Sequence, residues 1–386
     1  MWKTELQALI DQHLLRELSV IDSPASPIVD REGQKTLLMA SNNYLGLADH
    51  PSLKHAAQAA IQKFGVGAGA SRLLSGSQTP HHDLELALAQ FTGTEAALTF
   101  SSGYATNLGV IPCLAKANGL ILADRLCHAS LLDGCRLSRA TLRIFHHNDL
   151  EHLQQLLAKR PANRPTLIIT EGVFSMDGDL APLPDLVRLA EQYHATLLMD
   201  DAHGTGVMGP TGKGPIEHFG LDPGHILHMG TLSKALGTSG GFLAGSQDCI
   251  TYLINTARSF IYSTAPPPAM AAAAQTALEM IQQEPERRAR LWKNREQMHT
   301  GLTAMGYQLT PTQSPILPIL LNDPQLAVDM SQRLQQEGVY IPAIRPPTVP
   351  KGTSRLRVTV TADHSPEQLN FALKALQRVG TSLKIL

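Results

Sequence analysis

The chain has 386 residues, a hydrophobic content of 43% and a formal net charge of −1 at pH 7. This length favours two packed lobes, because single cores rarely grow beyond about 250–300 residues. The balanced charge favours neither a nucleic acid nor a membrane surface as a partner. The four cysteines have no paired metal-binding or disulfide spacing, so we expect reduced thiols.

Neither a signal peptide nor a membrane span is expected. The first five residues, MWKTE, include an acidic side chain and begin no uninterrupted apolar core. No apolar run approaches the roughly 20 residues that a spanning helix needs. We therefore expect a soluble protein of the cytoplasm.

An amphipathic helix at residues 4–20 and an alanine-rich helix at 53–64 are the first predicted elements. From residue 95 onward, short apolar strands alternate with helical stretches, which is typical of a mainly parallel sheet covered by helices. The predicted strands span residues 96–100, 120–123, 142–145, 166–170, 196–199, 225–229 and 241–244. We therefore expect a large α/β domain with a seven-stranded sheet.

A second, smaller lobe is predicted after three consecutive prolines at 266–268. A long helical region follows, and then come predicted strands at 316–321, 339–341 and 356–360 with helices at 324–337 and after 365. This mixture indicates an α+β lobe. The expected domains are an N-terminal helical segment at 1–45, the large α/β domain at 46–265, and a linking helix with the small α+β domain at 266–386.

Lys234 is the first candidate site residue, because it follows an apolar strand and sits among small residues in the segment GTLSKALG. A poorly solvated lysine there keeps the neutral amine that forms an imine. Upstream, Asp200 and His203 mark the carboxyl end of another buried strand, where α/β sheets bind ligands. A carboxylate that keeps a pyridine nitrogen protonated, together with an imine-forming lysine, suggests pyridoxal 5'-phosphate (PLP).

Plainer interpretations remain for the same residues. Lys234 is compatible with a surface lysine in a glycine loop, and Asp200 with the cap of a turn. Asp200 and His203 would be metal ligands only with a third and a fourth ligand, and the 16 histidines offer no obvious set. We therefore expect no metal.

The phosphate site is predicted at residues 101–107, which leave a strand and enter a helix. Hydroxyls, Gly103 and the N–H groups of a helix N-terminus bind anions without a lysine, although a plain helix cap has the same pattern. Residues 65–70, GVGAGA, fit a loose dinucleotide pattern, but a helix rather than a strand precedes them. A dinucleotide site is therefore not expected.

Three further residues complete the predicted pocket. His128 follows a strand and could stack its ring on a flat cofactor, although a lone histidine is often structural. Arg355 and Arg357 are alternate residues of a predicted strand and share a face. One of them could clamp a substrate carboxylate through two hydrogen bonds, and two solvated edge arginines are the alternative.

Several segments carry a family pattern: residues 41–47 (SNNYLGL), 67–76, 124–132, 170–182, 200–206 and 261–264. Together they resemble the α-oxoamine synthases, fold-type I PLP-dependent enzymes that join an amino acid to an acyl thioester with loss of CO2. The resemblance spans nearly the whole chain and implies a transferase of that fold and a homodimer with shared active sites. The segment 343–350, AIRPPTVP, most resembles the acyltransferases of biotin biosynthesis, which condense L-alanine with a pimeloyl thioester of coenzyme A or acyl carrier protein.

The resemblance also implies a role for individual residues. The implied catalytic set is the imine-forming Lys234, Asp200 at the pyridine nitrogen, His203 at the ring hydroxyl and His128 on the ring face. Further implied cofactor contacts are Gly103, Tyr104, Ser175 and Thr231, with Thr264 reaching the phosphate of the neighbouring subunit. The implied substrate contacts are Arg16, Asn42 and Arg355.

Other members of the family share these motifs. Glycine C-acetyltransferase, 5-aminolevulinate synthase and serine palmitoyltransferase use other substrates, and a hydrophobic pocket discriminates one methylene by only about 1–3 kcal/mol. A non-catalytic binding subunit of the same fold is a further alternative, and it would lack Lys234, Asp200 or His203. All three are present, which favours an enzyme.

Overall fold

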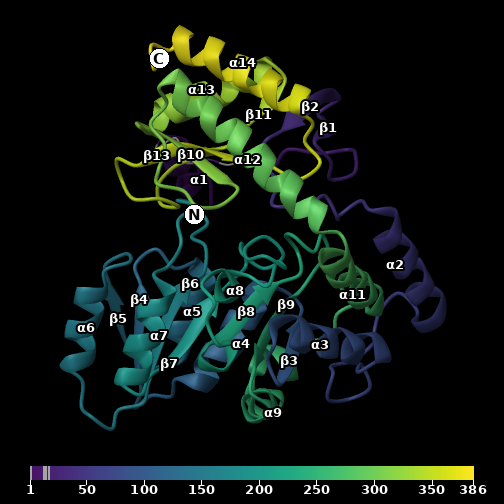
Figure 1. Ribbon diagram of the computed structural model, residues 1–386, viewed down its shortest axis with the longest axis vertical. Coiled ribbons are helices and arrows are strands. Elements are labelled where there is room, and N and C mark those ends of the chain that lie inside the picture. The colour runs from purple at the N-terminus through teal and green to yellow at the C-terminus, as the bar shows by residue number, and fades with distance from the viewer. Residues whose placement is uncertain (1, 12–14, 16–17) are drawn as a thin grey trace.

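The structure is a computed structural model that describes residues 2–11, 15 and 18–386. A large lobe and a smaller lobe are stacked along the long axis, and the long helix α12 (Pro285–Met305) runs from one to the other (Figure 1). Among the described residues, no helix has the length and apolar character needed to cross a membrane.

The large lobe is built on a seven-stranded sheet with the strand order β3-β9-β8-β7-β6-β4-β5. Strand β9 is antiparallel to its neighbours β3 and β8, and the other pairs are parallel. The strands are β3 (Ala96–Phe100), β4 (Leu120–Asp124), β5 (Thr141–Phe145), β6 (Thr166–Glu171), β7 (Thr196–Asp200), β8 (Leu227–Thr231) and β9 (Gly241–Gly245). The predicted mainly parallel sheet is confirmed.

Helices cover both faces of this sheet, which explains why central strands such as β4, β6 and β7 are mostly apolar and buried. In β4, Ile121 and Ala123 pack on the face of α4 (Gly103–Leu114) and α5 (Ala129–Leu137). The alternating residues Leu120 and Leu122 pack on the opposite face with α6 (Leu150–Ala158) and α7 (Leu183–Gln192). The other helices between residues 46 and 265 are α2 (Pro51–Phe64), α3 (Thr79–Thr92), α8 (Pro215–His218), the short 3-10 helix η1 (Pro223–His225), α9 (Gln247–Thr256) and α10 (Arg258–Ile261).

The small lobe combines an antiparallel sheet of order β10-β13-β12 with helices, as the expected α+β lobe does. Its elements after α12 are β10 (Ile316–Asn322), α13 (Pro324–Gln336), β11 (Val339–Tyr340), β12 (Ala343–Ile344), β13 (Ser354–Thr359) and α14 (Pro366–Ser382). Strand β12 was not predicted, because two residues are too few to show a period.

The N-terminal segment differs from the expected helical segment. Helix α1 (Trp2–Asp11) is shorter than the prediction over 4–20, and residues 18–20 are not helical. Strands β1 (Ile28–Arg31) and β2 (Gln34–Leu38) then form a hairpin, and β2 pairs in parallel with β11 of the small lobe. Glu32 and Gly33, with φ of 54° and 78°, provide the two-residue turn. Residues 1–45 therefore contribute two strands to a sheet shared with the small lobe.

The first helix after the prolines, α11 (Pro268–Gln283), packs on α2 and α3 of the large lobe. Its buried alanines, among them Ala271, Ala274 and Ala277, allow the helices to approach closely. Helix α12 packs on α14 in the small lobe. The chain therefore passes between the lobes along α12, and not at the prolines.

Candidate active site

The carboxyl ends of the parallel strands line a cavity of about 250 Å³, at the edge where α/β sheets bind ligands. The N-terminus of α4 and the loop after β8 complete its wall. All the residues predicted to contact the cofactor within one chain line this cavity, namely Gly103, Tyr104, His128, Ser175, Asp200, His203, Thr231 and Lys234. The structure therefore brings together residues that come from separate strands and loops.

Lys234 and His203 face each other in this cavity, with Nζ of Lys234 2.8 Å from Nε2 of His203. Burial lowers the pKa of Lys234 to about 8, although the carboxylates of Asp200 and Glu171 oppose this effect. Burial and the nearby Lys234 hold the pKa of His203 well below its usual range. The site therefore combines a neutral imidazole with an amine that loses its proton close to neutral pH, as a nucleophilic lysine requires.

Asp200, the last residue of β7, accepts hydrogen bonds from two N–H donors. Nδ2 of Asn107 donates to Oδ2 at 2.9 Å, and the backbone N–H of Ala202 donates to Oδ1 at 3.0 Å. Nδ2 of Asn107 also donates to Oγ of Ser130 at 2.9 Å, and this hydroxyl lies 2.8 Å from Nδ1 of His128. A hydrogen-bonded chain thus links the carboxylate of Asp200 to the imidazole of His128.

Glu171 and Asn107 line the cavity but were not assigned a role from the sequence, although Asn107 ends the predicted phosphate segment 101–107. Glu171 ends β6 directly beside Asp200 in the strand register, and it accepts a hydrogen bond from the backbone N–H of His128 at 2.6 Å. Burial, reinforced by Asp200, raises the pKa of Glu171 to about 8. The signal in the sequence was position, because Glu171 directly follows the predicted strand 166–170 as Asp200 follows the predicted strand 196–199.

The N-terminus of α4 forms the part of the wall where phosphate is expected. Ser102 caps the helix, and its Oγ accepts from the backbone N–H of Ala105 at 3.0 Å. The first N–H groups of a helix have no intrahelical partner, so those of Gly103 and Tyr104 are available to an anion. A Cβ at Gly103 would lie 3.1 Å from Cε of Met229, so any larger residue would crowd this wall.

The two arginines of β13 are buried, with exposed fractions of 3% for Arg355 and 6% for Arg357, and are not solvated edge residues. Nη1 of Arg355 lies 2.6 Å from Oδ1 of Asp177 and forms an ion pair. Arg357 instead donates to the carbonyl of Ser175 at 2.6 Å and to Oδ1 of Asn42 at 3.2 Å. Arg357, and not the predicted substrate contact Arg355, therefore lies next to the other predicted site residues.

Three other predicted contacts, Asn42, Thr264 and Arg16, do not line the cavity or cannot be placed. Asn42 is connected to the site only indirectly, because its Oδ1 accepts a hydrogen bond from Arg357. Thr264 is exposed, forms an isolated backbone bridge with Ser71 and does not line the cavity, so its contact with a neighbouring subunit stays a prediction. Arg16 lies outside the described residues.

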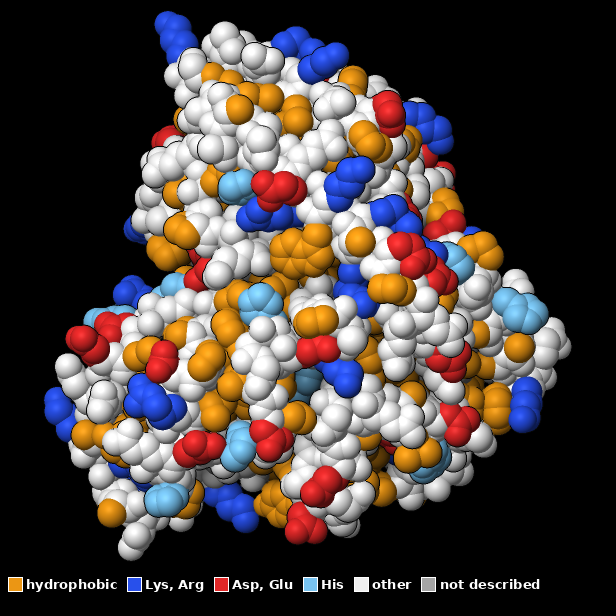
Figure 2. All heavy atoms as spheres, in the orientation of Figure 1, with side chains coloured by type: hydrophobic (Ala, Val, Ile, Leu, Met, Phe, Trp, Pro, Cys, Tyr) orange, Lys and Arg blue, Asp and Glu red, His pale blue; other side chains and the backbone are white. Residues whose placement is uncertain are grey.

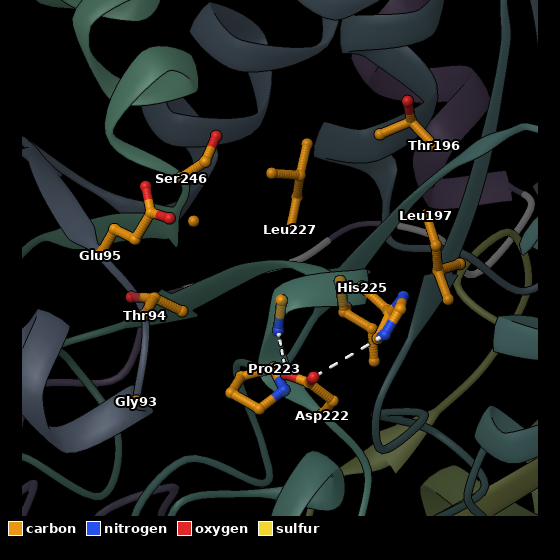
Figure 3. A pocket seen from close by; sticks show the side chains of 13 residues that line it. Gly93, Thr94, Glu95, Thr196, Leu197, Asp222, Pro223, His225, Leu227 and Ser246 are labelled. Carbon is orange, nitrogen blue, oxygen red and sulfur yellow. Dashed lines mark hydrogen bonds and ion pairs between the residues drawn. The ribbon is translucent and has the colours of Figure 1, made fainter.

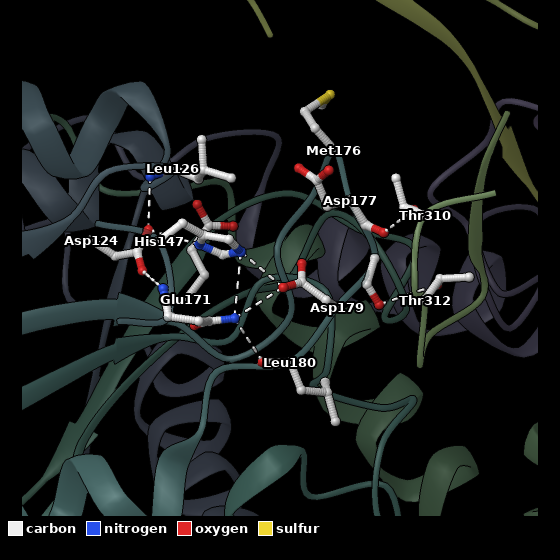
Figure 4. Close-up of polar contacts among 12 residues, drawn as sticks. Asp124, Leu126, His147, Glu171, Met176, Asp177, Asp179, Leu180, Thr310 and Thr312 are labelled. Carbon is white, nitrogen blue, oxygen red and sulfur yellow. Dashed lines mark hydrogen bonds and ion pairs between the residues drawn. The ribbon is translucent and has the colours of Figure 1, made fainter. Parts of the chain in front are cut away.

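Ser175 is carried on a turn, residues 174–179, that is held from both lobes (Figure 4). On the large-lobe side, His147 lies between two carboxylates, with Nδ1 3.0 Å from Asp124 and Nε2 2.9 Å from Asp179. On the small-lobe side, Oγ1 of Thr310 donates to a backbone carbonyl of the turn at 2.8 Å. The position of Ser175 therefore depends on both lobes.

His147→Gln is expected to destabilise the protein by about 3 kcal/mol, the low end for breaking a buried ion pair, because a quarter of the imidazole is exposed (25%). Burial lowers the pKa of His147, but hydrogen bonds to Asp124 and Asp179 outweigh it and raise the pKa to about 10. Since this pKa is above the usual value of about 6.5, the stabilisation is complete below about pH 6.5 and is lost as the pH rises through about 10.

Urea unfolding at pH 6 and pH 10.5 measures this effect. The difference between wild type and His147→Gln should be large at the lower pH and small at the higher one. The exposed His55→Gln serves as the control variant. Equal differences at both pH values would contradict the ion-pair account.

A larger cavity, of about 440 Å³, lies at the opposite edge of the sheet, beside the amino ends of β7 and β8 (Figure 3). Two of its polar side chains are already engaged locally, since Oδ1 of Asp222 accepts from the N–H of Gly224 and Oδ2 lies 3.8 Å from Nε2 of His225. Among the described residues, none lines both this cavity and the active-site cavity. Because α/β sheets bind ligands at the carboxyl edge, its volume does not make it the active site.

One surface cluster has the donor atoms of a metal site. His146, Asp149 and His152 bring their ligand atoms within 4.8 Å of one another at the start of α6. Asp149 caps the helix through the N–H of His152, and Nδ1 of His152 accepts from the N–H of His146 at 3.2 Å. These local contacts account for the cluster, which lies outside the cavity lining.

Comparisons with known proteins give matches over nearly the whole chain. Residues 34–376 match the family model of class I and II aminotransferases. The 8-amino-7-oxononanoate synthase of Geobacter sulfurreducens is 48% identical over 99% of this chain and 98% of that protein. The 8-amino-7-oxononanoate synthase 1 of Bacillus subtilis is 42% identical over 100% of this chain and 98% of that protein.

Solved structures agree with these matches. A serine palmitoyltransferase variant from S. paucimobilis with PLP and myriocin bound has a TM-score of 0.95 and 36% identity, over 100% of this chain and 98% of that one. An 8-amino-7-oxononanoate synthase from Francisella tularensis has a TM-score of 0.79 and 29% identity, over 91% of this chain and 99% of that one. The predicted fold type I is confirmed. The chain belongs to the class I and II aminotransferase family and, within it, to the 8-amino-7-oxononanoate synthases of the α-oxoamine synthase group.

Proposed function

We propose that the chain catalyses the decarboxylative condensation of L-alanine with a pimeloyl thioester, which yields 8-amino-7-oxononanoate, CO2 and a free thiol in biotin biosynthesis. The observation that carries the proposal is the single cavity in which Lys234, Asp200 and the N-terminus of α4 meet. Identities of 48% and 42% to synthases of that name support the substrates. The enzyme is a PLP-dependent acyltransferase.

The groups around the cavity fit pyridoxal 5'-phosphate. Backbone N–H groups of Gly103 and Tyr104 would hold the phosphate, and the carboxylate of Asp200 would meet the pyridine nitrogen. The buried Oδ1 of Asn107 has no hydrogen-bond partner within the described part of the chain, so an acceptor is left for a bound group. When bound, the cofactor supplies an electron sink for the bonds broken at the amino-acid α-carbon.

The side chains of the cavity supply binding and proton transfer. The amine of Lys234, with its pKa near 8, is matched to taking and returning the α-proton at neutral pH. The carboxylate of Asp200 would keep the pyridine nitrogen of the bound cofactor protonated. His128 is oriented by the hydroxyl of Ser130 and would lie against the ring.

Arg357 is the better candidate for the carboxylate of the amino acid. Arg355 is already neutralised by Asp177. Arg357 has only neutral acceptors in the part of the chain that the structure describes: the Ser175 carbonyl, Asn42 and the Thr359 hydroxyl. A buried cation without an anionic partner attracts a carboxylate, and a guanidinium can bind it with two hydrogen bonds.

Arg357→Lys is expected to lower kcat/KM for the amino acid about 100-fold, because hydrogen bonds to a charged group contribute about 1.5–3 kcal/mol. Most of the change should appear in KM. The matched variant Arg355→Lys, two residues away on the same strand face, should change kcat/KM less than tenfold. The reverse order in steady-state kinetics would assign the carboxylate to Arg355.

The proposal includes a cytoplasmic homodimer with shared active sites. In this dimer, Thr264 would contact the phosphate of the cofactor bound in the neighbouring subunit. Leu74 and Tyr262 are 82% and 73% exposed, and their segments join at the Ser71–Thr264 bridge. Large exposed apolar side chains of this kind favour burial in an interface. Sedimentation velocity of the purified protein should give the mass of a dimer.

The substrate assignment is tested by thiol release from pimeloyl-CoA by the PLP-loaded protein, with L-alanine, glycine and L-serine in parallel. Release with alanine alone supports the assignment, and a repeat with pimeloyl-acyl carrier protein compares the two acyl carriers. The serine arm matters because of the likeness to a serine palmitoyltransferase. Release with glycine or serine instead would keep the family and replace the substrate.

A further inference from the structure

Tyr44 reaches the active site from behind His203. Its side chain is fully buried (0% exposed), and its hydroxyl lies 2.7 Å from Nδ1 of His203 and 3.4 Å from Oδ1 of Asn42. The other ring nitrogen of His203, Nε2, faces Lys234 in the cavity at 2.8 Å. Tyr44 therefore binds His203 on the side away from the cavity.

The hydroxyl of Tyr44 has one proton and two neighbouring acceptors. Arg357 donates to Oδ1 of Asn42 at 3.2 Å, and its positive charge opposes the rise that burial causes in the pKa of Tyr44. A guanidinium has no acceptor, so the proton of Tyr44 can go only to Nδ1 of His203 or to Oδ1 of Asn42. The geometry favours Nδ1 of His203, since 2.7 Å is a strong hydrogen-bond distance and 3.4 Å is at the limit.

The charge state of His203 allows the same arrangement. Burial and the surrounding cations, Lys234 and Arg357, hold its pKa well below the usual range, so the imidazole is neutral. A neutral imidazole has one N–H and one acceptor nitrogen. If Nδ1 accepts from Tyr44, then Nε2 carries the proton. A free ammonium on Lys234 would donate to Nε2 and so require the proton of His203 on Nδ1. Once Lys234 is bonded to the cofactor, it is no longer an ammonium and does not impose this tautomer.

We propose that Tyr44 is a positioning residue that selects the tautomer of His203, so that Nε2 presents its proton to the ring oxygen of the bound cofactor. The inference rests on the cofactor of the proposed function and not on its amino-acid or acyl substrate. Without the hydroxyl, the proton is shared between the two nitrogens, and the cavity loses its donor for part of the time.

The test compares Tyr44→Phe with Tyr307→Phe. Each variant loses one buried hydroxyl, and that of Tyr307 donates to the carbonyl of Leu376 at 2.8 Å within the small lobe. The visible absorbance of the PLP-loaded proteins is titrated with pH. Without the donor at Nε2 of His203, more negative charge remains on the ring oxygen of the cofactor. The proton on the imine nitrogen beside this oxygen is then held more tightly. The midpoint in Tyr44→Phe should therefore rise by about one pH unit, the equivalent of one hydrogen bond, and that in Tyr307→Phe should not change.

An unchanged midpoint in Tyr44→Phe, or an equal shift in Tyr307→Phe, overturns the inference. If Tyr44→Phe does not bind the cofactor, nitrogen-15 NMR of PLP-loaded wild type decides the question. A proton on Nε2 of His203 supports the inference, and a proton on Nδ1 overturns it. The expected shift without thiol release would leave the tautomer inference intact and refute the proposed substrates.

Discussion

Lys234→Ala is expected to abolish both the reaction and the visible absorbance of the bound cofactor. Its amine, 2.8 Å from Nε2 of His203 and with a pKa lowered by burial to about 8, is the nucleophile and the proton-transfer group of the site. A positioned general base contributes about 10²–10⁴-fold to the rate. Because the covalent link to the cofactor is lost as well, we expect kcat to fall at least about 10³-fold.

Absorbance spectra of the purified protein with added PLP, together with thiol release, measure this effect. The exposed Lys159→Ala is the matched control, because it removes a lysine that does not line the cavity. A visible band of wild-type intensity in Lys234→Ala would show that another lysine holds the cofactor. That result would move the active site away from the loop after β8.

Asp200→Asn is expected to lower kcat about 10²–10³-fold, the range for removing one preorganised electrostatic contact in an active site. Asparagine has nearly the same volume but no negative charge, so it cannot keep a pyridine nitrogen protonated. Its amide would also face Nδ2 of Asn107, which now donates to the carboxylate at 2.9 Å. The fall in kcat should therefore exceed the fall that loss of the negative charge alone would cause.

Steady-state kinetics at saturating L-alanine isolates the effect on kcat, and a spectroscopic PLP titration measures cofactor affinity separately. Asp222→Asn, at the cavity on the opposite edge of the sheet (Figure 3), should leave both unchanged. An Asp200→Asn enzyme within a factor of ten of wild type would contradict the role of Asp200 at the ring nitrogen.

The amino-acid sequence by itself determined the parallel sheet and the core of the site. Strands such as β7 are continuous apolar runs because both faces are buried, and this pattern is visible locally. Asp200 and Lys234 could be found because each stands just beyond such a run. The carboxyl ends of parallel strands meet at one edge, so a local pattern predicted a shared cavity.

Other features were decided only by tertiary structure. Arg355 and Arg357 are equivalent in the strand pattern, and the turn at 174–179 distinguishes them by giving one an aspartate and the other a carbonyl. Tyr44 meets His203 across 159 positions of sequence. Such contacts depend on how the lobes and loops pack, and no local periodicity encodes that packing. The same holds for β2, which pairs with β11 from the other end of the chain.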